Sequence, residues 1–189
     1  MFNSLPSSVM IDAASGGVSP HTGRYQKRLS DLDGIFHDQA AWSDAIRKSA
    51  DAVVYEVVES RQDGCDMFFG TTIVAPGKVG SEFYMTRGHF HARRDRGEVY
   101  STLKGQGILL LETRDGQTEV LKMCEGAVAC IPPDLAHRTI NTGDCPLIFS
   151  WVCSVDAGHD YAPIRECGMR KLVVERGGLI AVIDNLSLR

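Results

Sequence analysis

The chain has 189 residues, of which 43% are hydrophobic and 23% charged, and its formal net charge is −4. These values are ordinary for a globular protein with a sizeable core, and the lack of a basic block argues against nucleic acid as a partner. No apolar run approaches the ~18 residues of a membrane helix, and residues 1–20 hold no secretory signal pattern, so we expect no membrane association.

The six cysteines are scattered, and none forms a C-x-x-C pair; they stand at positions 65, 124, 130, 145, 153 and 167. Such spacing fits neither a disulfide framework nor a zinc knuckle. We therefore expect reduced cysteines that serve as packing residues in a cytoplasmic protein.

Residues 1–27 are polar and rich in Ser, Gly and Pro, which predicts an arm lying across the body, and residues 28–36 form a turn-rich approach. A helix is predicted from about Asp38 to Ser49. Asp38 can cap its start, and one apolar stripe follows at helical spacing, formed by Ala41, Trp42, Ala45 and Ile46. We expect Trp42 to anchor this helix against a sheet.

From Val53 onward the chain is a succession of short β-type runs. They cover residues 53–59, 67–74, 83–91, 99–103, 108–112, 128–131, 137–141, 147–155, 171–175 and 179–183. Residues 75–80 make a turn, and residues 114–117 carry an Asp-Gly hairpin signal. Many short strands with regular turns indicate a sandwich or barrel. We expect one domain over 1–189, with arm and helix in 1–50 and the barrel with C-terminal strands in 51–189.

A possible metal-ligand set stands out within these strands. His89 and His91 are two residues apart, so on a strand both side chains project from one face. Glu98 follows a charged loop that ends in Gly97, and His137 lies beyond a Pro-Pro-Asp turn. Three imidazoles and a carboxylate suit a divalent ion such as iron, manganese, nickel or zinc.

The order His-x-His, Glu, Lys-Gly-Gln-Gly, Pro-Pro, His resembles the two motifs of the cupin superfamily. More narrowly, residues 71–80, 86–91, 98–100, 132–133, 136–141 and 156–161 resemble the cupin-type glucose-6-phosphate isomerases of archaea and some bacteria. The segments Pro-Gly-Lys-Val-Gly and Asp-Ala-Gly-His-Asp-Tyr carry this identification, and the likeness runs from about Arg28 to Asn185. It implies an all-β double-stranded β-helix (cupin or jelly-roll) barrel with a short helix and an N-terminal arm.

The resemblance also implies a set of functional residues. One divalent metal ion per chain, with Fe2+ favoured over Mn2+, Ni2+ or Zn2+, would be held by His89, His91, Glu98 and His137. Glucose 6-phosphate and fructose 6-phosphate would be interconverted, as in glycolysis and gluconeogenesis, in a cytoplasmic homodimer. The substrate-binding residues would be Thr72, Thr86, Gly88, Tyr100, His159 and Tyr161.

Several of these residues also fit a pocket on simpler grounds. Tyr100 is two residues beyond Glu98, so both should face the barrel interior. One departure from the family is visible, because Cys153 stands where the family usually has a tyrosine associated with the substrate pocket. Lys78 or Arg87 would help to hold the phosphate, or else form a solvated rim.

The ligand set suits isomerisation. Four protein ligands on a six-coordinate ion leave two positions for sugar oxygens O1 and O2, so the metal can act as Lewis acid and template. Glu98 can carry the proton between C2 and C1 through a cis-enediol. A hydride shift or a different base stays open, because metal ligation lowers a carboxylate's basicity. Two other functions also stay open, a metal-dependent cupin dioxygenase and a non-catalytic sugar-phosphate-binding cupin.

Overall fold

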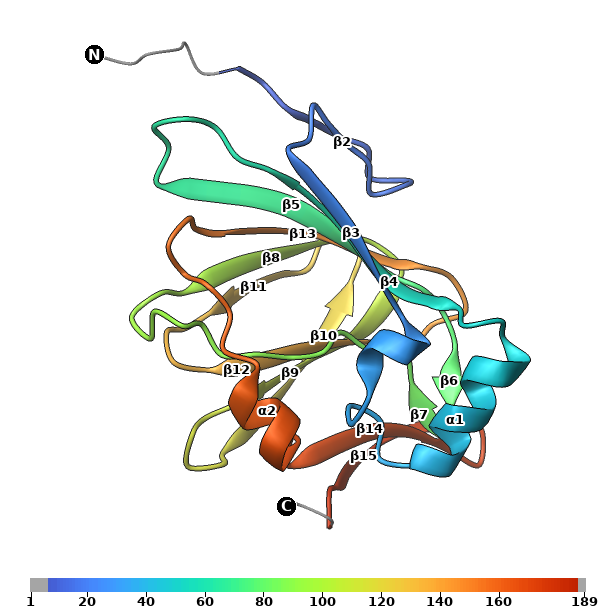
Figure 1. Ribbon diagram of the computed structural model, residues 1–189. Helices are drawn as coiled ribbons and strands as arrows, with labels where there is room; N and C mark the ends of the chain where they lie inside the picture. The colour runs from blue at the N-terminus through green and yellow to red at the C-terminus, as the bar shows by residue number, and fades with distance from the viewer. Residues whose placement is uncertain (1–6, 187–189) are drawn as a thin grey trace.

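The computed structural model describes residues 7–186, which fold into two layers of antiparallel strands (Figure 1). The upper layer is a six-stranded sheet in the order β11-β8-β13-β5-β4-β3. Its strands are β3 (Gly23–Arg28), β4 (Val53–Ser60), β5 (Met67–Val74), β8 (Glu98–Lys104), β11 (Val128–Ile131) and β13 (Leu147–Ser154). This arrangement confirms the all-β cupin fold that the sequence predicts.

The lower layer consists of a three-stranded sheet, β10-β9-β12, and a four-stranded sheet, β15-β14-β7-β6. Its strands are β6 (Lys78–Val79), β7 (Glu82–Phe83), β9 (Gln106–Glu112), β10 (Thr118–Cys124), β12 (Ala136–Asn141), β14 (Lys171–Arg176) and β15 (Leu179–Asp184). A bridge between Met85 and Ile140 joins the two sheets, because Met85 follows β7 and Ile140 belongs to β12.

The predicted strand over residues 83–91 is wrong. Regular pairing ends with β7 at Phe83, and only single bridges follow at Met85, His89 and Phe90. The reason is an extra residue near Gly88, where φ is +76°. The other predicted strands are confirmed within one or two residues of their ends.

The sequence reading missed β3, β10 and the helix α2 (Ala162–Cys167). It also missed four very short elements: β1 (Met10–Ile11), β2 (Val18–Ser19), η1 (Leu29–Leu32) and β6, the last of which lies within the predicted turn over residues 75–80. β3 has mostly exposed positions and only one aromatic residue, so it carries little apolar pattern. β10 follows the hairpin that the Asp-Gly signal predicts and pairs with β9 along its whole length. The helix α2 has only six residues, too few to show a helical period.

The predicted helix is confirmed as α1 (Gln39–Lys48), and the Asp38 side chain accepts a hydrogen bond from the Ala41 N–H. The Trp42 indole packs against the core and donates a hydrogen bond to the carbonyl of Leu29, which begins the 3-10 helix η1 (Leu29–Leu32). Trp42 therefore anchors α1 to the barrel, as the sequence predicts.

The described part of the N-terminal arm, from residue 7, lies on the outer face of the six-stranded sheet. β1 (Met10–Ile11) and β2 (Val18–Ser19) form a small hairpin. Between them, the Gly16 carbonyl accepts a hydrogen bond from the buried Thr71 hydroxyl. A Cβ added to Gly16 would lie 2.5 Å from an Ile73 side-chain atom, so glycine permits this close approach. Residues 1–6 lie outside the described residues.

All six cysteines are free, as expected, but the expectation that they are packing residues holds only for Cys153. The other five are exposed. Cys124 and Cys130 occupy outward-facing strand positions, and loops or a helix end carry the rest. Spacing alone could not separate the two faces of these strands.

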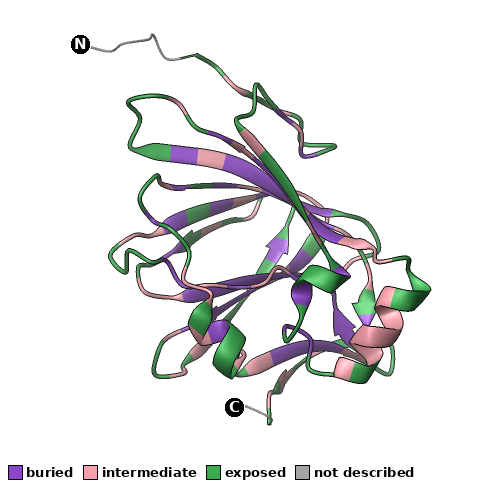
Figure 2. Cartoon of the chain, viewed as in Figure 1, coloured by how far each residue is buried: buried purple, intermediate pink, exposed green. Residues whose placement is uncertain are grey.

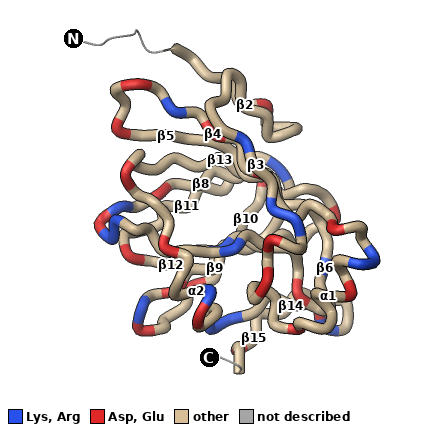
Figure 3. The backbone as a smooth tube through the Cα atoms, in the orientation of Figure 1, with Lys and Arg blue, Asp and Glu red and all other residues tan. Residues whose placement is uncertain are grey.

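The buried residues lie between the two sheet layers (Figure 2). Acidic and basic residues alternate along the loops and around α1, without a large region of one sign (Figure 3). Among the described residues, no helix is long and apolar enough to cross a membrane.

Asn141 ties the end of β12 to the end of β5. Its side-chain amide donates to the carbonyls of Val74 and Cys145, each at 2.9 Å, and its Oδ1 accepts from the Gly143 N–H. The residue is fully buried. Its amide therefore satisfies three backbone groups where water has little access.

We expect Asn141→Ala to lower the free energy of unfolding by about 2–4 kcal/mol, because each backbone group left buried without a partner costs about 1–3 kcal/mol. Urea denaturation measures the difference. Gln117→Ala, at an exposed turn position, is the control and should change stability by less than about 0.5 kcal/mol. Equal stability of the two variants would contradict this role of Asn141.

Candidate metal centre

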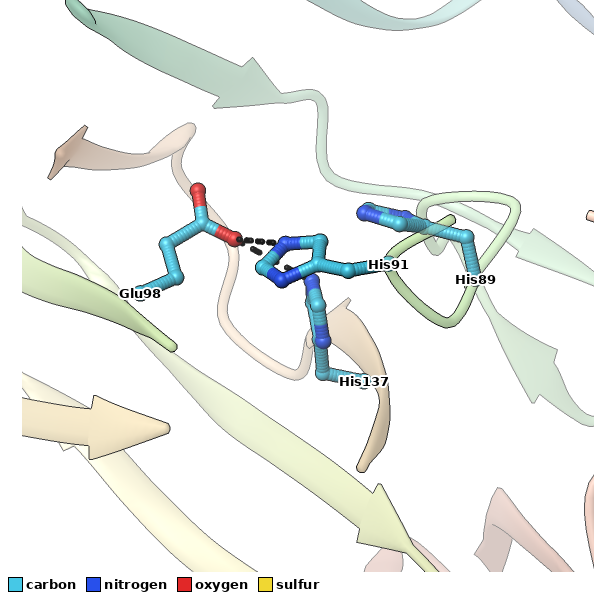
Figure 4. A group of neighbouring side chains, drawn as sticks. All are labelled: His89, His91, Glu98 and His137. Atoms are coloured by element: carbon cyan, nitrogen blue, oxygen red, sulfur yellow. Dashed lines mark hydrogen bonds and ion pairs between the residues drawn. The ribbon is translucent and has the colours of Figure 1, made fainter. Parts of the chain in front are cut away.

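Four side chains from three separate chain segments converge inside the barrel (Figure 4). His89 and His91 come from the irregular segment after β7, Glu98 is the first residue of β8, and His137 is the second residue of β12. One potential ligand atom from each residue lies within 4.8 Å of all the others. The chain thus brings together the full set of residues that the sequence predicts as metal ligands.

The Glu98 carboxylate lies against two of the imidazoles. Its Oε2 is 3.3 Å from Nε2 of His91 and 3.2 Å from Nε2 of His137 (Figure 4). The ring of His89 completes the group, with its centroid 4.3 Å from that of His137.

The other ring nitrogen of two histidines is held by the backbone. His91 Nδ1 lies 2.9 Å from the Arg96 carbonyl, and His137 Nδ1 lies 3.2 Å from the Leu135 carbonyl. A carbonyl only accepts, so each Nδ1 carries the proton and each Nε2 lone pair faces the centre. This is the usual way in which proteins orient a metal-ligating histidine.

Two ring nitrogens at the centre, Nε2 of His89 and Nε2 of His137, are buried and have no hydrogen-bond partner among residues 7–186. His89 as a whole is only half-buried, but this atom is inaccessible to water. A buried polar atom without a partner is costly. A cation among these atoms would satisfy both nitrogens.

The charges at the centre also suit a divalent cation. Burial and the neighbouring imidazoles hold the pKa of His89 well below its usual value, so the ring is neutral and able to ligate. Burial tends to raise the pKa of Glu98, but the neighbouring side chains of His137 and His91 outweigh this effect and lower the pKa. Three nitrogen donors and one anionic oxygen fit a borderline divalent ion.

A β-bulge explains how His89 reaches this group. Met85 pairs with Ile140, and His89 pairs with His137, so one strand advances by four residues while the other advances by three. The extra residue lies at Gly88, in the left-handed region that favours glycine.

The bulge decides which way the His89 side chain points. Side chains alternate between the two faces of a strand. Without the bulge, regular pairing from Met85 onward would place His89 opposite Ala136 and turn its side chain away from that of His137. The extra residue instead brings both imidazoles to one face. The irregularity that ends the predicted strand is therefore the feature that assembles the cluster.

The cluster opens into a pocket that contains every residue the sequence predicts for substrate binding. Thr72, Thr86, Gly88, Tyr100, His159 and Tyr161 all line it. Arg87 also lines this pocket, whereas Lys78 does not and instead pairs with Glu175 at 2.6 Å. Lys78 is therefore not placed to hold a ligand here.

The sequence reading missed most of one wall of the pocket. This wall is largely aromatic and is built by β3, β4, β5 and β13; it comprises Tyr25, Tyr55, Val57, Glu59, Phe68, Phe149 and Trp151. Cys153 lies in the same wall, buried, with its backbone paired to that of Glu98. The inward-facing positions of the predicted strands β4 and β5 could have indicated part of this wall. Tyr25 could not be expected there, because it lies on β3, which the sequence reading missed.

His159 and Tyr161 form the near wall. Their rings stack with centroids 5.4 Å apart, and the His159 ring meets that of His89 edge-on at 4.3 Å. The Arg87 guanidinium lies 5.5 Å from the centroid of Tyr161. The wall thus contacts the cluster through His159 and the bulge through Arg87.

Asp156 fastens the segment that carries this wall. Its carboxylate accepts two hydrogen bonds from Arg96, at 2.8 and 3.0 Å, and pairs with Arg93 at 3.1 Å. The backbones of Phe90 and Asp160 also pair. Residues 156–161 are therefore attached to the same loop that precedes Glu98.

Fold and site together define a cupin β-barrel with a three-histidine, one-glutamate centre. The family model of the glucose-6-phosphate isomerases matches residues 26–185. The glucose-6-phosphate isomerases of Thermococcus onnurineus and Pyrococcus horikoshii are each 47% identical over 95% of both chains, and that of Sinorhizobium medicae is 40% identical over 97% of this chain and 88% of its own. The chain belongs to the glucose-6-phosphate isomerase family, whose members are aldose–ketose isomerases.

The similar solved structures include the oxalate decarboxylase of Bacillus subtilis. It shares 20% identity, with a TM-score of 0.47, over 56% of this chain and 27% of its own.

We expect Asp156→Ala to speed amide hydrogen exchange at Phe90 and Asp160, because the segment loses its attachment to Arg93 and Arg96. Native-state exchange followed by NMR measures this. Asp134→Ala is the matched control, since Asp134 pairs with Arg94 of the same loop but not with the 156–161 segment. Equal acceleration in both variants would contradict the attachment described above.

Proposed function

We propose that this protein interconverts glucose 6-phosphate and fructose 6-phosphate in a metal-dependent reaction. The observation that carries the proposal is the cluster of three imidazoles and Glu98 at the base of the pocket, in a chain of this family. The convergence of the predicted site residues on one pocket supports the roles proposed for them.

The metal in this proposal is one divalent ion, with Fe2+ favoured, held by His89, His91, Glu98 and His137. The two partnerless ring nitrogens and the carboxylate support the assignment. When bound, the ion would polarise neighbouring sugar oxygens as a Lewis acid.

Glu98 is the proposed base. Its carboxylate is buried and ionised, lies against two of the imidazoles and lines the pocket. It would take the proton from C2 and return it to C1 of a cis-enediol, while the neighbouring Tyr100 would help to position the sugar.

The phosphate would lie toward the bulge. Thr86, Arg87 and Gly88 line the pocket there, and Thr72 lines the same pocket from β5. Hydroxyl and backbone N–H groups are suitable donors to a phosphate. The stacked His159 and Tyr161 would close the other side of the sugar.

We propose that the chain works as a cytoplasmic homodimer and folds as one domain. Support for the dimer comes from the outer face of the six-stranded sheet, where Val99, Val128 and Val152 are exposed. Val99 and Val152 are directly paired across β8 and β13, so part of this apolar surface is continuous.

A coupled assay on metal-stripped and reconstituted protein tests the proposed function. We expect little conversion of glucose 6-phosphate by the stripped protein and recovery when Fe2+ is restored under anaerobic conditions. Full metal occupancy without isomerisation would overturn the proposal. Oxygen uptake with an organic substrate would then favour the dioxygenase, and sugar-phosphate binding without turnover would favour the binding protein.

We expect His137→Ala to hold substoichiometric metal and to lose most isomerase activity, because the ion loses one of its four protein ligands. Elemental analysis of the purified protein measures occupancy. His21→Ala, at an exposed position outside the pocket, is the control and should keep full occupancy. Full occupancy in His137→Ala would remove this residue from the ligand set.

We expect Glu98→Asp to lower kcat more than it raises KM, because the shortened carboxylate misses the reacting proton. Steady-state kinetics of the metal-loaded variant measures the split. A variant with unchanged kcat and only a raised KM would take Glu98 out of the chemistry.

The reaction in D2O separates the proposed base from a hydride shift. A proton held on Glu98 can exchange with solvent, so deuterium should enter C1 of fructose 6-phosphate. Normal isomerisation with no deuterium uptake would favour the hydride shift or a base shielded from water.

A further inference from the structure

Arg138 is a buried guanidinium directly beside His137, with 3% of its surface exposed. It does not line the pocket that contains the metal cluster. Within the described part of the chain it forms no ion pair closer than 4.0 Å. Its Nη2 donates a hydrogen bond of 2.7 Å to the Arg87 carbonyl, on the opposite strand. Burying a charge without a close ion pair is costly, so the position of this guanidinium needs a structural explanation.

The β-bulge supplies that explanation. Side chains complete the bonding of the backbone around it: the Thr139 N–H donates to the Thr86 hydroxyl at 3.0 Å, and the Arg87 carbonyl accepts from Arg138. Arg138 stands opposite the two residues Arg87 and Gly88. It is the side chain on the facing strand that can fill and hold the bulge.

Gly88 packs directly on Arg138. A Cβ added to Gly88 would lie 3.0 Å from Arg138 Nε and 3.3 Å from its Cβ. The positive φ of Gly88 adds to the demand for glycine at this position. Arg138 and Gly88 therefore fit each other, and a change in either should displace the bulge.

Two buried carboxylates, those of Glu82 and Glu112, favour the charged form of the guanidinium from more than 4.0 Å away. Glu82 is fixed by the His37 N–H at 2.6 Å, and Glu112 by the Arg170 N–H at 2.7 Å. Burial lowers the pKa of Arg138 to about 10, which leaves it protonated at neutral pH.

We propose that Arg138 is a positioning residue for the metal centre, holding the Arg87–Gly88 bulge so that the His89 imidazole turns into the cluster. Arg138 acts through the Arg87 carbonyl and touches neither metal nor substrate. The inference rests on the proposed metal site but not on the isomerase reaction.

Metal affinity tests this role independently of activity. We expect Arg138→Met, which keeps an unbranched side chain but removes the charge and the donors, to weaken Co2+ binding by about tenfold to a hundredfold. Titration of the stripped protein, followed by the visible absorption of bound Co2+, gives the dissociation constant and reports the ligand geometry. Met123→Ala, a substitution at a buried position of β10, is the control for a general loss of stability. It should keep both the Co2+ dissociation constant and the absorption spectrum of the wild type.

Two further variants protect the test against failure to fold. Arg138→Lys keeps the positive charge and a group that can donate to the Arg87 carbonyl, so it should retain more Co2+ affinity than Arg138→Met. Gly88→Ala should weaken Co2+ binding too, and its effect should not add to that of Arg138→Lys, because both displace the same bulge. Wild-type affinity and spectrum in the Arg138 variants, or equal loss in Met123→Ala, would overturn the proposal.

If the wild type binds Co2+ but does not isomerise glucose 6-phosphate after reconstitution with Fe2+, the proposed reaction fails while this test remains decisive. If both Arg138 variants lose stability but bind Co2+ as tightly as the wild type, Arg138 has only a general structural role.

Discussion

The candidate site depends on one extra residue in a strand pair. With regular pairing along β12, every second side chain of the facing segment would point into the barrel. The His89 side chain would then point away from that of His137. The bulge at Gly88 shifts this alternation by one position, so that His89 and His137 share a face. A small backbone irregularity thus converts an ordinary strand pair into half of a four-residue cluster.

The barrel accommodates this polar cluster because the surrounding backbone orients it. Carbonyl groups of Arg96 and Leu135 fix the rings of His91 and His137, and Glu98 lies against both. Partnerless nitrogens inside a protein cost about 1–3 kcal/mol each. Such a site is less stable empty than filled, so metal binding and folding are coupled.

The sequence alone predicts which residues form the site more readily than it predicts the backbone geometry that brings them together. His89, His91, Glu98 and His137 were recognisable because their order resembles a known motif, and they do converge. The strand expected over 83–91 was wrong because a bulge is set by pairing with β12, a segment far away in the chain.

Other features escaped for similar reasons. β3 has few apolar residues, so Tyr25 was not expected in the pocket, and α2 is too short to show a helical period. Arg138 could not be identified as a buried residue, since nothing local marks an arginine on a strand as enclosed between sheet layers. Pocket walls built from several strands become visible only once the pairing is known.

The most direct test of the account is the position of the metal itself. Crystals of the reconstituted protein, measured at the absorption edge of the bound metal, should show one anomalous peak per chain. We predict that this peak lies within bonding distance of Nε2 of His89, His91 and His137 and of a Glu98 oxygen. A peak elsewhere, or a peak that His89 does not reach, would contradict the account.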